Sequence, residues 1–191
     1  IAQERDVHMI LFFGPTGAGK SMQGQMLAVR MGWKWLSTGE MLRQSSDSEV
    51  IAVLKSGELV SDELTYEVFD AAIRDAAAQE YGNIIVDGFP RTKAQAEWLA
   101  DYMERNKHTI DLVVALEVPE SVIMQRLEKR ARMEDTPETI ARRMAIYRQK
   151  MYPLLAVFAE DHVPIVHLDG NGTVGTIHDK IYGELEHRGI V

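Results

Sequence analysis

Short apolar runs alternate along this chain with longer stretches of helical pattern. The short runs are apolar on both faces, which is typical of parallel strands that helices cover on each side. Strands are predicted at residues 7–13, 34–36, 83–86, 112–118 and 164–168. Helices are predicted at residues 20–31, 65–79, 93–105, 120–132, 137–158 (interrupted near Pro153) and 174–187. Strands that alternate with helices indicate an open, doubly wound α/β sheet.

Two segments depart from this alternation. Residues 38–64 have a helical pattern with no strand among them, and residues 131–136 form a short charged break. We expect both segments to be inserts that can move relative to the sheet. Ser61 is placed to cap the helix that follows the first insert. The residues that recur with helical spacing there are Leu64, Val68, Ala71, Ala72 and Asp75.

The composition fits one ordered domain. The chain has 191 residues, of which 46% are hydrophobic and 26% charged, so we expect a single domain over residues 1–191. The absence of cysteine from the sequence excludes disulfides, thiolate zinc sites and a cysteine nucleophile. A net charge of -8 disfavours non-specific binding of nucleic acid.

The apolar runs are far shorter than the roughly 18 residues that cross a bilayer. The first residues also lack the basic and then apolar plan of a signal peptide. We therefore expect a cytoplasmic protein with no membrane partner.

Residues 14–21 (Gly-Pro-Thr-Gly-Ala-Gly-Lys-Ser) match the phosphate-binding pattern G-x-x-x-x-G-K-[ST] between a predicted strand and a predicted helix. Glycines let backbone N–H groups turn toward a phosphate, and the helix N-terminus adds positive potential there. Lys20 would reach the β- and γ-phosphates, and Ser21 could present its hydroxyl to Mg²⁺. The alternative is an ordinary glycine-rich turn, but the context favours a site for a nucleoside triphosphate.

Four further segments follow this P-loop. They are residues 37–43, 56–63, 87–92 and the arginine-rich stretch 126–143. In this order, and together with the P-loop, they resemble the adenylate kinases of the nucleoside monophosphate kinase family. The resemblance runs from about His8 to the last predicted helix, and its most specific part is Asp-Gly-Phe-Pro-Arg at residues 87–91.

The resemblance implies a P-loop α/β/α fold of three layers with a parallel five-stranded sheet. It also implies a helical AMP-binding insert at residues 37–66 and a very short lid at residues 130–137. The implied reaction is reversible phosphoryl transfer from MgATP to AMP, which gives two ADP. The partners would be ATP, AMP and ADP, the cofactor Mg²⁺, and the protein a monomer. The lid has no cysteine, so we expect no structural zinc.

The resemblance also assigns roles to residues. The implied ATP-binding residues are Gly14, Gly17, Ala18, Gly19, Lys20, Ser21, Met22, Arg126, Arg130 and Gly172. The implied AMP-binding residues are Thr38, Arg43, Glu58, Val60, Gly88, Arg91, Gln95, Arg132 and Arg143. The implied catalytic residues are Lys20, Arg91, Arg126, Arg130, Arg132 and Arg143. Ser21 and Asp87 would hold Mg²⁺ through water.

These residue types suit that chemistry. An arginine offers a planar fork of donors to a phosphate, and clustered arginines neutralise charge on a transferring phosphoryl group. Considered by itself, Arg43 would be interpreted as a solvated charge on the surface. Gln95 can donate and accept at once, as an adenine edge requires, although it could also be an exposed helix residue. Thr38 and Gln95 match the positions at which adenylate kinases select AMP.

Besides its short lid, the sequence departs from the family pattern in two places that bear on the site. Residues 19–22 read Gly-Lys-Ser-Met instead of the usual Gly-Lys-Gly-Thr, and Glu58 stands where relatives often carry lysine. Two other functions stay open, namely a UMP/CMP kinase on the same scaffold and a catalytically silent nucleotide-binding switch module. The intact Lys20 and Arg91 and the set of lid arginines count against the silent module.

Overall fold

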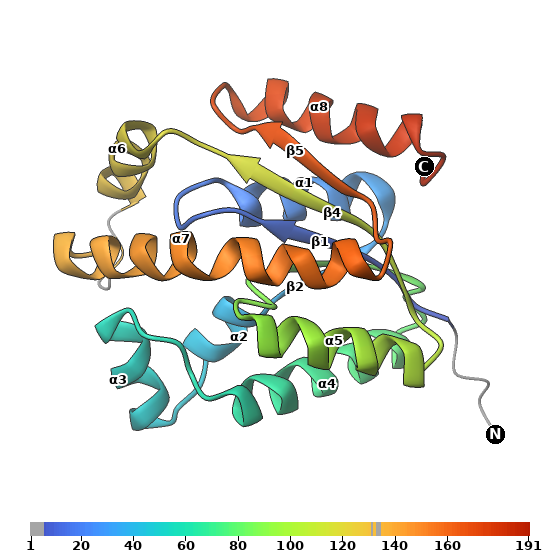
Figure 1. The fold of residues 1–191 in the computed structure, drawn as a ribbon, viewed down its shortest axis with the longest axis horizontal. Coiled ribbons are helices and arrows are strands. Elements are labelled where there is room, and N and C mark those ends of the chain that lie inside the picture. Colours follow the sequence, from blue (N-terminus) through green and yellow to red (C-terminus); the bar gives the residue numbers. More distant parts are fainter. Residues whose placement is uncertain (1–5, 131, 133–134) are drawn as a thin grey trace.

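The computed structural model describes residues 6–130, 132 and 135–191. Within these residues, five parallel strands form one sheet in the order β2-β3-β1-β4-β5, with helices on both faces (Figure 1). The strands are β1 (His8–Phe13), β2 (Lys34–Ser37), β3 (Asn83–Asp87), β4 (Thr109–Glu117) and β5 (Ile165–Asp169). The helices are α1 (Lys20–Met31), α2 (Thr38–Arg43), α3 (Ser48–Ser56), α4 (Asp62–Ala78), α5 (Lys93–Arg105), α6 (Glu120–Arg130), α7 (Pro137–Glu160) and α8 (Val174–His187).

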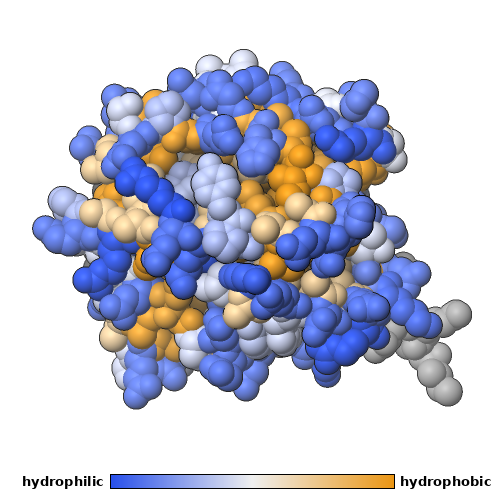
Figure 2. Space-filling view, viewed as in Figure 1, coloured by the Kyte–Doolittle hydropathy of each residue, from blue (hydrophilic) through white to orange (hydrophobic). Residues whose placement is uncertain are grey.

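Alternate residues of the central strand enter two different cores. Met9 and Leu11 of β1 pack with buried residues of α4, α5 and α7, whereas Ile10 and Phe12 pack with buried residues of α1 and α8. Because both faces of the sheet are covered, the strands are apolar throughout, as the sequence predicts. Polar side chains cover most of the face shown in Figure 2, with hydrophobic patches visible between them. Along the described ranges, no helix combines the length and the apolar character that crossing a bilayer requires.

Helical structure between β2 and β3 is confirmed. The segment forms α2, α3 and the start of α4, with no strand among the described residues. Ser61 caps α4 as expected, since its hydroxyl accepts a hydrogen bond from the backbone N–H of Leu64 at 3.4 Å. The helix begins three residues earlier than predicted, at Asp62. Its buried residues are Thr65, Phe69, Ile73 and Ala76, not the set noted in the sequence.

Other elements also differ from the prediction. Strand β4 begins at Thr109, three residues earlier than predicted, and α6, which was predicted to reach residue 132, has Arg130 as its last described residue. Helix α7 continues through Pro153, where an interruption was expected. Proline removes one helical hydrogen bond, but Leu154, Leu155, Val157 and Phe158 pack into the core directly after it. This packing outweighs the lost bond. Of the predicted lid at residues 130–137, residues 131, 133 and 134 lie outside the described residues.

Candidate active site

A cleft opens at the carboxyl ends of the central strands. Strand β1 lies between β3 and β4, and ligands of open α/β sheets bind at such a point, where the connections diverge to opposite sides. Phe12 is paired with Asp87, so the loops after β1 and β3 leave the sheet side by side. The cleft has a volume of about 210 Å³. Its polar lining includes Gly14, Gly17, Gly19, Lys20, Ser21, Arg43, Gly57, Glu58, Asp87, Gly88, Arg91, Arg130, Arg132 and Arg143.

The P-loop closes around its own lysine. Lys20 Nζ donates hydrogen bonds to the carbonyl oxygens of Gly14 at 2.8 Å and Pro15 at 2.9 Å. A Cβ atom on Gly14 would lie 2.9 Å from the carbonyl oxygen of Leu116, so the loop needs glycine where it passes β4. Gly19, with φ at 97°, occupies the N-cap position of α1. The loop therefore holds Lys20 at the N-terminus of that helix.

The charge of Lys20 is only weakly compensated. Burial lowers the pKa of Lys20 to about 8 despite the opposing field of Asp87, and nearby Arg91 and Arg130 lower the pKa further. A phosphate placed beside Lys20 would favour its charged form. The lysine is therefore suited to bind an anion.

Ser21 and Asp87 form an oxygen-rich pair beside Lys20. The Ser21 hydroxyl donates a hydrogen bond to Asp87 Oδ2 at 2.5 Å, and Asp87 is 3% exposed at the end of β3. Mg²⁺ is usually bound by one or two protein oxygens together with water and substrate phosphates. In the described part of the chain, no three His, Cys, Asp or Glu side chains form a complete metal site. The pair fits Mg²⁺ that arrives with a nucleotide.

Five arginines approach the cleft from different elements. Arg43 comes from the last turn of α2, Arg91 from the loop after β3, Arg130 from the end of α6, and Arg143 from α7, while Arg132 lies beyond α6. Burial holds the pKa of Arg91 below its ordinary value; Asp87 opposes this shift, and Arg143 and Arg43 add to it. So many like charges around one cleft are best compensated by a polyanionic ligand.

Asp135 is a charged partner of the cleft arginines that the sequence analysis did not single out. It accepts hydrogen bonds from Arg130 Nε at 2.9 Å and Nη2 at 2.7 Å, and Arg143 Nη1 lies 3.6 Å away. Its side chain is 1% exposed. Burial raises the pKa of Asp135, but the hydrogen bonds and charge of Arg130 outweigh this and hold the pKa below its usual value. Asp135 therefore fixes two cleft arginines.

Arg126 is placed differently from the other lid arginines. Its guanidinium donates to the carbonyl oxygens of Ala18 at 3.3 Å and Gly170 at 2.9 Å. It therefore joins the P-loop to the loop after β5 and is not among the residues that line the cleft. Gly172 in that second loop is exposed, and Met22 is 53% exposed on α1.

The predicted base-selecting residues lie behind the cleft wall. Gln95 is 2% exposed; its Oε1 accepts from the backbone N–H of Arg91 at 2.8 Å, and its Nε2 donates to Asp62 Oδ1 at 2.7 Å. Thr38 is equally buried, and its hydroxyl lies 3.2 Å from where a Cβ atom on Gly88 would be. Val60 is half-buried, one residue beyond the Gly57–Leu59 segment that lines the cleft.

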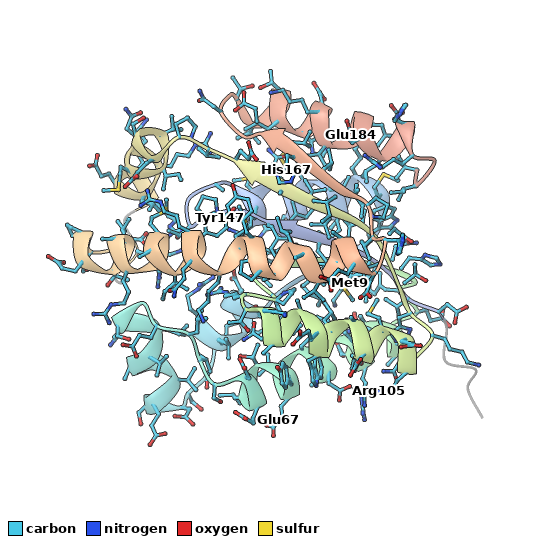
Figure 3. The ribbon with its side chains drawn as sticks, in the orientation of Figure 1. Met9, Glu67, Arg105, Tyr147, His167 and Glu184 are labelled. Carbon is cyan, nitrogen blue, oxygen red and sulfur yellow. The ribbon has the colours of Figure 1, made fainter. Side chains whose placement is uncertain are left out.

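Sequence reasoning missed one aromatic residue of the cleft. Tyr147, labelled on α7 in Figure 3, is one of the residues that line the cleft. Burial and the negative charge of Glu117 raise the pKa of Tyr147, so its hydroxyl stays protonated. Its position four residues after Arg143, on the same helix face, is the signal that would have found it.

Known proteins are similar in sequence to this chain along nearly its whole length. The adenylate kinase family model matches residues 12–163, which include the P-loop, residues 87–91 and the cleft arginines. Adenylate kinase of Caulobacter vibrioides is 38% identical over 187 residues, covering 93% of this chain and 96% of the relative. Adenylate kinase of Parasynechococcus marenigrum is 36% identical (90% and 95% covered), and that of Thermus thermophilus is 36% identical (92% and 96% covered). The chain belongs to the adenylate kinase family.

Proposed function

We propose that this protein transfers the terminal phosphoryl group of ATP to AMP, reversibly, and so forms two ADP. The observation that carries the proposal is a cleft lined by two regions that are suited to phosphate. One region is the P-loop with Lys20, and the other is Arg43 and Arg91. A kinase with a nucleotide as acceptor needs both regions within reach of each other, so that the two phosphates can be aligned for direct transfer.

The donor ATP would bind at the P-loop. Its phosphates would accept hydrogen bonds from backbone N–H groups of residues 14–21 and from Lys20, which would exchange the carbonyls of Gly14 and Pro15 for phosphate oxygens. The adenosine end would lie toward Met22, Arg126 and Gly172. Since Arg126 already binds Gly170, it would orient the loop that holds the adenine.

The acceptor AMP would bind on the β3 side of the cleft. Arg43 and Arg91 would hold its phosphate by paired charge-assisted hydrogen bonds. The base would lie against the insert at residues 37–66, beside Thr38, Gly88 and Gln95, with backbone groups at Glu58 and Val60 flanking it. The hydrogen bond from the Arg91 N–H to Gln95 couples the proposed base site to the proposed phosphate site.

Transfer needs alignment and charge neutralisation but no covalent intermediate on the protein. A phosphate oxygen of AMP attacks the γ-phosphorus, the bond to the β-phosphate oxygen breaks, and ADP leaves. Lys20, Arg130, Arg132 and Arg143 would stabilise the charge on the transferring group, and Arg126 would assist from the P-loop. Ser21 and Asp87 would hold Mg²⁺ through water; the ion supplies further charge neutralisation at the phosphates. The short lid at residues 130–137 would carry Arg130 and Arg132 toward them.

The test is phosphoryl transfer from MgATP to AMP, UMP, CMP and GMP, measured separately with the purified protein. We expect AMP to be the fastest acceptor. Faster transfer to UMP or CMP would favour the UMP/CMP kinase on the same scaffold. Nucleotide binding without transfer to any of the four would favour the silent switch module.

A further inference from the structure

The carboxyl end of α3 is held by side chains of α7. The last carbonyl groups of a helix have no partner within the helix. Here Arg143 Nη2 donates to the carbonyl oxygen of Leu54 at 3.1 Å, Thr139 Oγ1 to that of Lys55 at 3.3 Å, and Arg142 Nη1 to that of Ser56 at 3.2 Å. Three consecutive carbonyls of α3 therefore find their donors on a helix more than 80 residues later in the sequence.

The backbone after α3 also touches α7 closely. Gly57, with φ at 78°, ends α3, and a Cβ atom on it would lie 2.9 Å from Thr139 Cγ2. Thr139 is 5% exposed, so its methyl group fills the space beside Gly57. One residue further, Glu58 Oε1 accepts from Arg142 Nη1 at 3.1 Å. Arg142 thus binds the chain on both sides of Gly57.

The held segment forms part of the cleft wall. Leu54, Gly57, Glu58 and Leu59 all line the cleft, whereas neither Thr139 nor Arg142 does. These two side chains therefore act on the wall from behind. Thr139 is buried and its hydrogen bond to Lys55 is part-buried, so this bond is expected to have the larger effect. Both side chains of the Arg142–Glu58 ion pair are at least half exposed. This ion pair is therefore expected to contribute little to holding the cleft wall.

We propose that Thr139 and Arg142 are positioning residues for the acceptor nucleotide. They bind the carboxyl end of α3 and hold residues 54–59 in the place where the acceptor base binds. The identity of that acceptor as AMP rests on the proposed function. Their hydrogen bonds to the carbonyls of Lys55 and Ser56 hold this segment in place. Gly57 has no side chain and so lets α7 come close to the end of α3.

The test compares variants that remove each bond. Thr139→Val removes the hydroxyl and keeps the shape, and Thr139→Ser keeps the hydroxyl and serves as the rescue. Arg142→Ala removes an exposed side chain and so leaves a folded protein even if Thr139→Val does not fold. Arg148→Ala is the matched control, because Arg148 lies on α7 and pairs with Glu120.

Three quantities are measured for each variant: the calorimetric Kd for the acceptor, the calorimetric Kd for ATP, and hydrogen exchange of the amides of residues 54–61. Losing the hydrogen bond to the carbonyl of Lys55 or of Ser56 should raise the Kd of the acceptor by about 3-fold to 10-fold in Thr139→Val and Arg142→Ala. The same two variants should exchange faster over residues 54–61, while the Kd of ATP stays within about twofold. Thr139→Ser and Arg148→Ala should resemble the wild type in all three measurements.

Unchanged exchange, an unchanged acceptor Kd, or equal losses for acceptor and ATP would overturn the proposal. The acceptor used is whichever of AMP, UMP, CMP and GMP the wild type binds most tightly. A wild type that prefers UMP therefore contradicts the proposed function while the exchange and affinity comparison still decides the role of Thr139 and Arg142. A wild type that binds none of the four overturns both.

Discussion

Asp135 and Arg130 form a two-bond ion pair across the charged break between α6 and α7, with the carboxylate almost fully buried. The same carboxylate faces Arg143 on α7. It therefore joins two arginines that the proposed mechanism brings to the transferring phosphoryl group. An acidic residue at this place reduces the repulsion between the arginines before a nucleotide binds and keeps both in a fixed orientation.

Replacement of Asp135 by asparagine should lower kcat by about tenfold, because small misplacement of groups at a reacting centre has large effects on rate. The KM for AMP should change less. Steady-state kinetics of Asp135→Asn, with Glu138→Gln as the control on the same segment, measures this. A kcat equal to that of the wild type would show that Asp135 does not position the arginines.

The depressed pKa of Asp135 also predicts a pH dependence of stability. A carboxyl group whose pKa is lower in the folded state stabilises the protein above its unfolded-state value of 3.8, and this contribution is lost as the pH falls through the folded-state pKa. The free energy of unfolding of wild type minus that of Asp135→Asn should therefore be positive at neutral pH and shrink on acidification below 3.8. Urea unfolding at several pH values measures the difference. A difference that grows on acidification would contradict the assignment.

Lys20 should take up a proton when ATP binds near pH 8. Its pKa of about 8 leaves the lysine partly neutral there in the free protein, and phosphate charges favour the protonated form. Uptake should approach roughly half a proton at this pH and fall as the pH decreases. Calorimetry in buffers of different ionisation enthalpy measures it. In Lys20→Ala the uptake should vanish and transfer should drop by about 100-fold or more; equal uptake in this variant would place the titrating group elsewhere.

Gln95→Ala should weaken AMP use and also destabilise the fold. Removing the amide takes away the part-buried hydrogen bonds to the Arg91 N–H and to Asp62 Oδ1, which costs about 1–3 kcal/mol in the free energy of unfolding. The KM for AMP should rise more than the KM for ATP. Chemical denaturation and two-substrate kinetics separate the effects. An equal rise of both KM values would indicate general loosening of the cleft and not a role in binding the base.

The short break between α6 and α7 should leave the ATP site incompletely sealed. Closing segments bring arginines to the phosphates and also exclude water, and the proposed lid has little area for the second task. We expect measurable ATP hydrolysis without AMP, above that of a relative with a long lid. Inserting a longer lid between Arg132 and Pro137 should reduce phosphate release more than transfer. Separate assays of ADP and inorganic phosphate decide it: no detectable release from the wild type would show that the turn seals well.

The sequence predicted the sheet well because local pattern determines it. Strands that are apolar on both faces allow one arrangement, a parallel sheet between two helical layers, and residues 9–12 pack accordingly. The buried face of α4 was harder to predict from the sequence. Small alanines occur on several sides of this helix, and only contact with the rest of the fold selects Phe69 and Ile73 as its core residues.

The candidate site likewise has a part that the local sequence predicted and a part that it did not. The P-loop and residues 87–91 are contiguous motifs, and the structure brings both to one cleft. Asp135, Tyr147 and the α7 side chains that hold α3 were not foreseen, since their importance depends on contacts between distant segments. Arg126 carried a phosphate signal in the sequence, yet its guanidinium binds two backbone carbonyls in the structure. The roles of all these residues in binding and catalysis stay predictions.

Because Phe12 of β1 is paired with Asp87 of β3, the residues that would set the geometry of the reaction are separate from those that would select the nucleotide. Neighbouring strands lie about 4.8 Å apart, a spacing that main-chain hydrogen bonds set. The loop after β1 and the loop after β3 therefore leave the sheet at a separation that no side chain of the cleft walls determines. Substitutions in those walls can alter which base is accepted or how well water is excluded. The distance between the loops that hold the two reacting phosphates would stay the same through such changes.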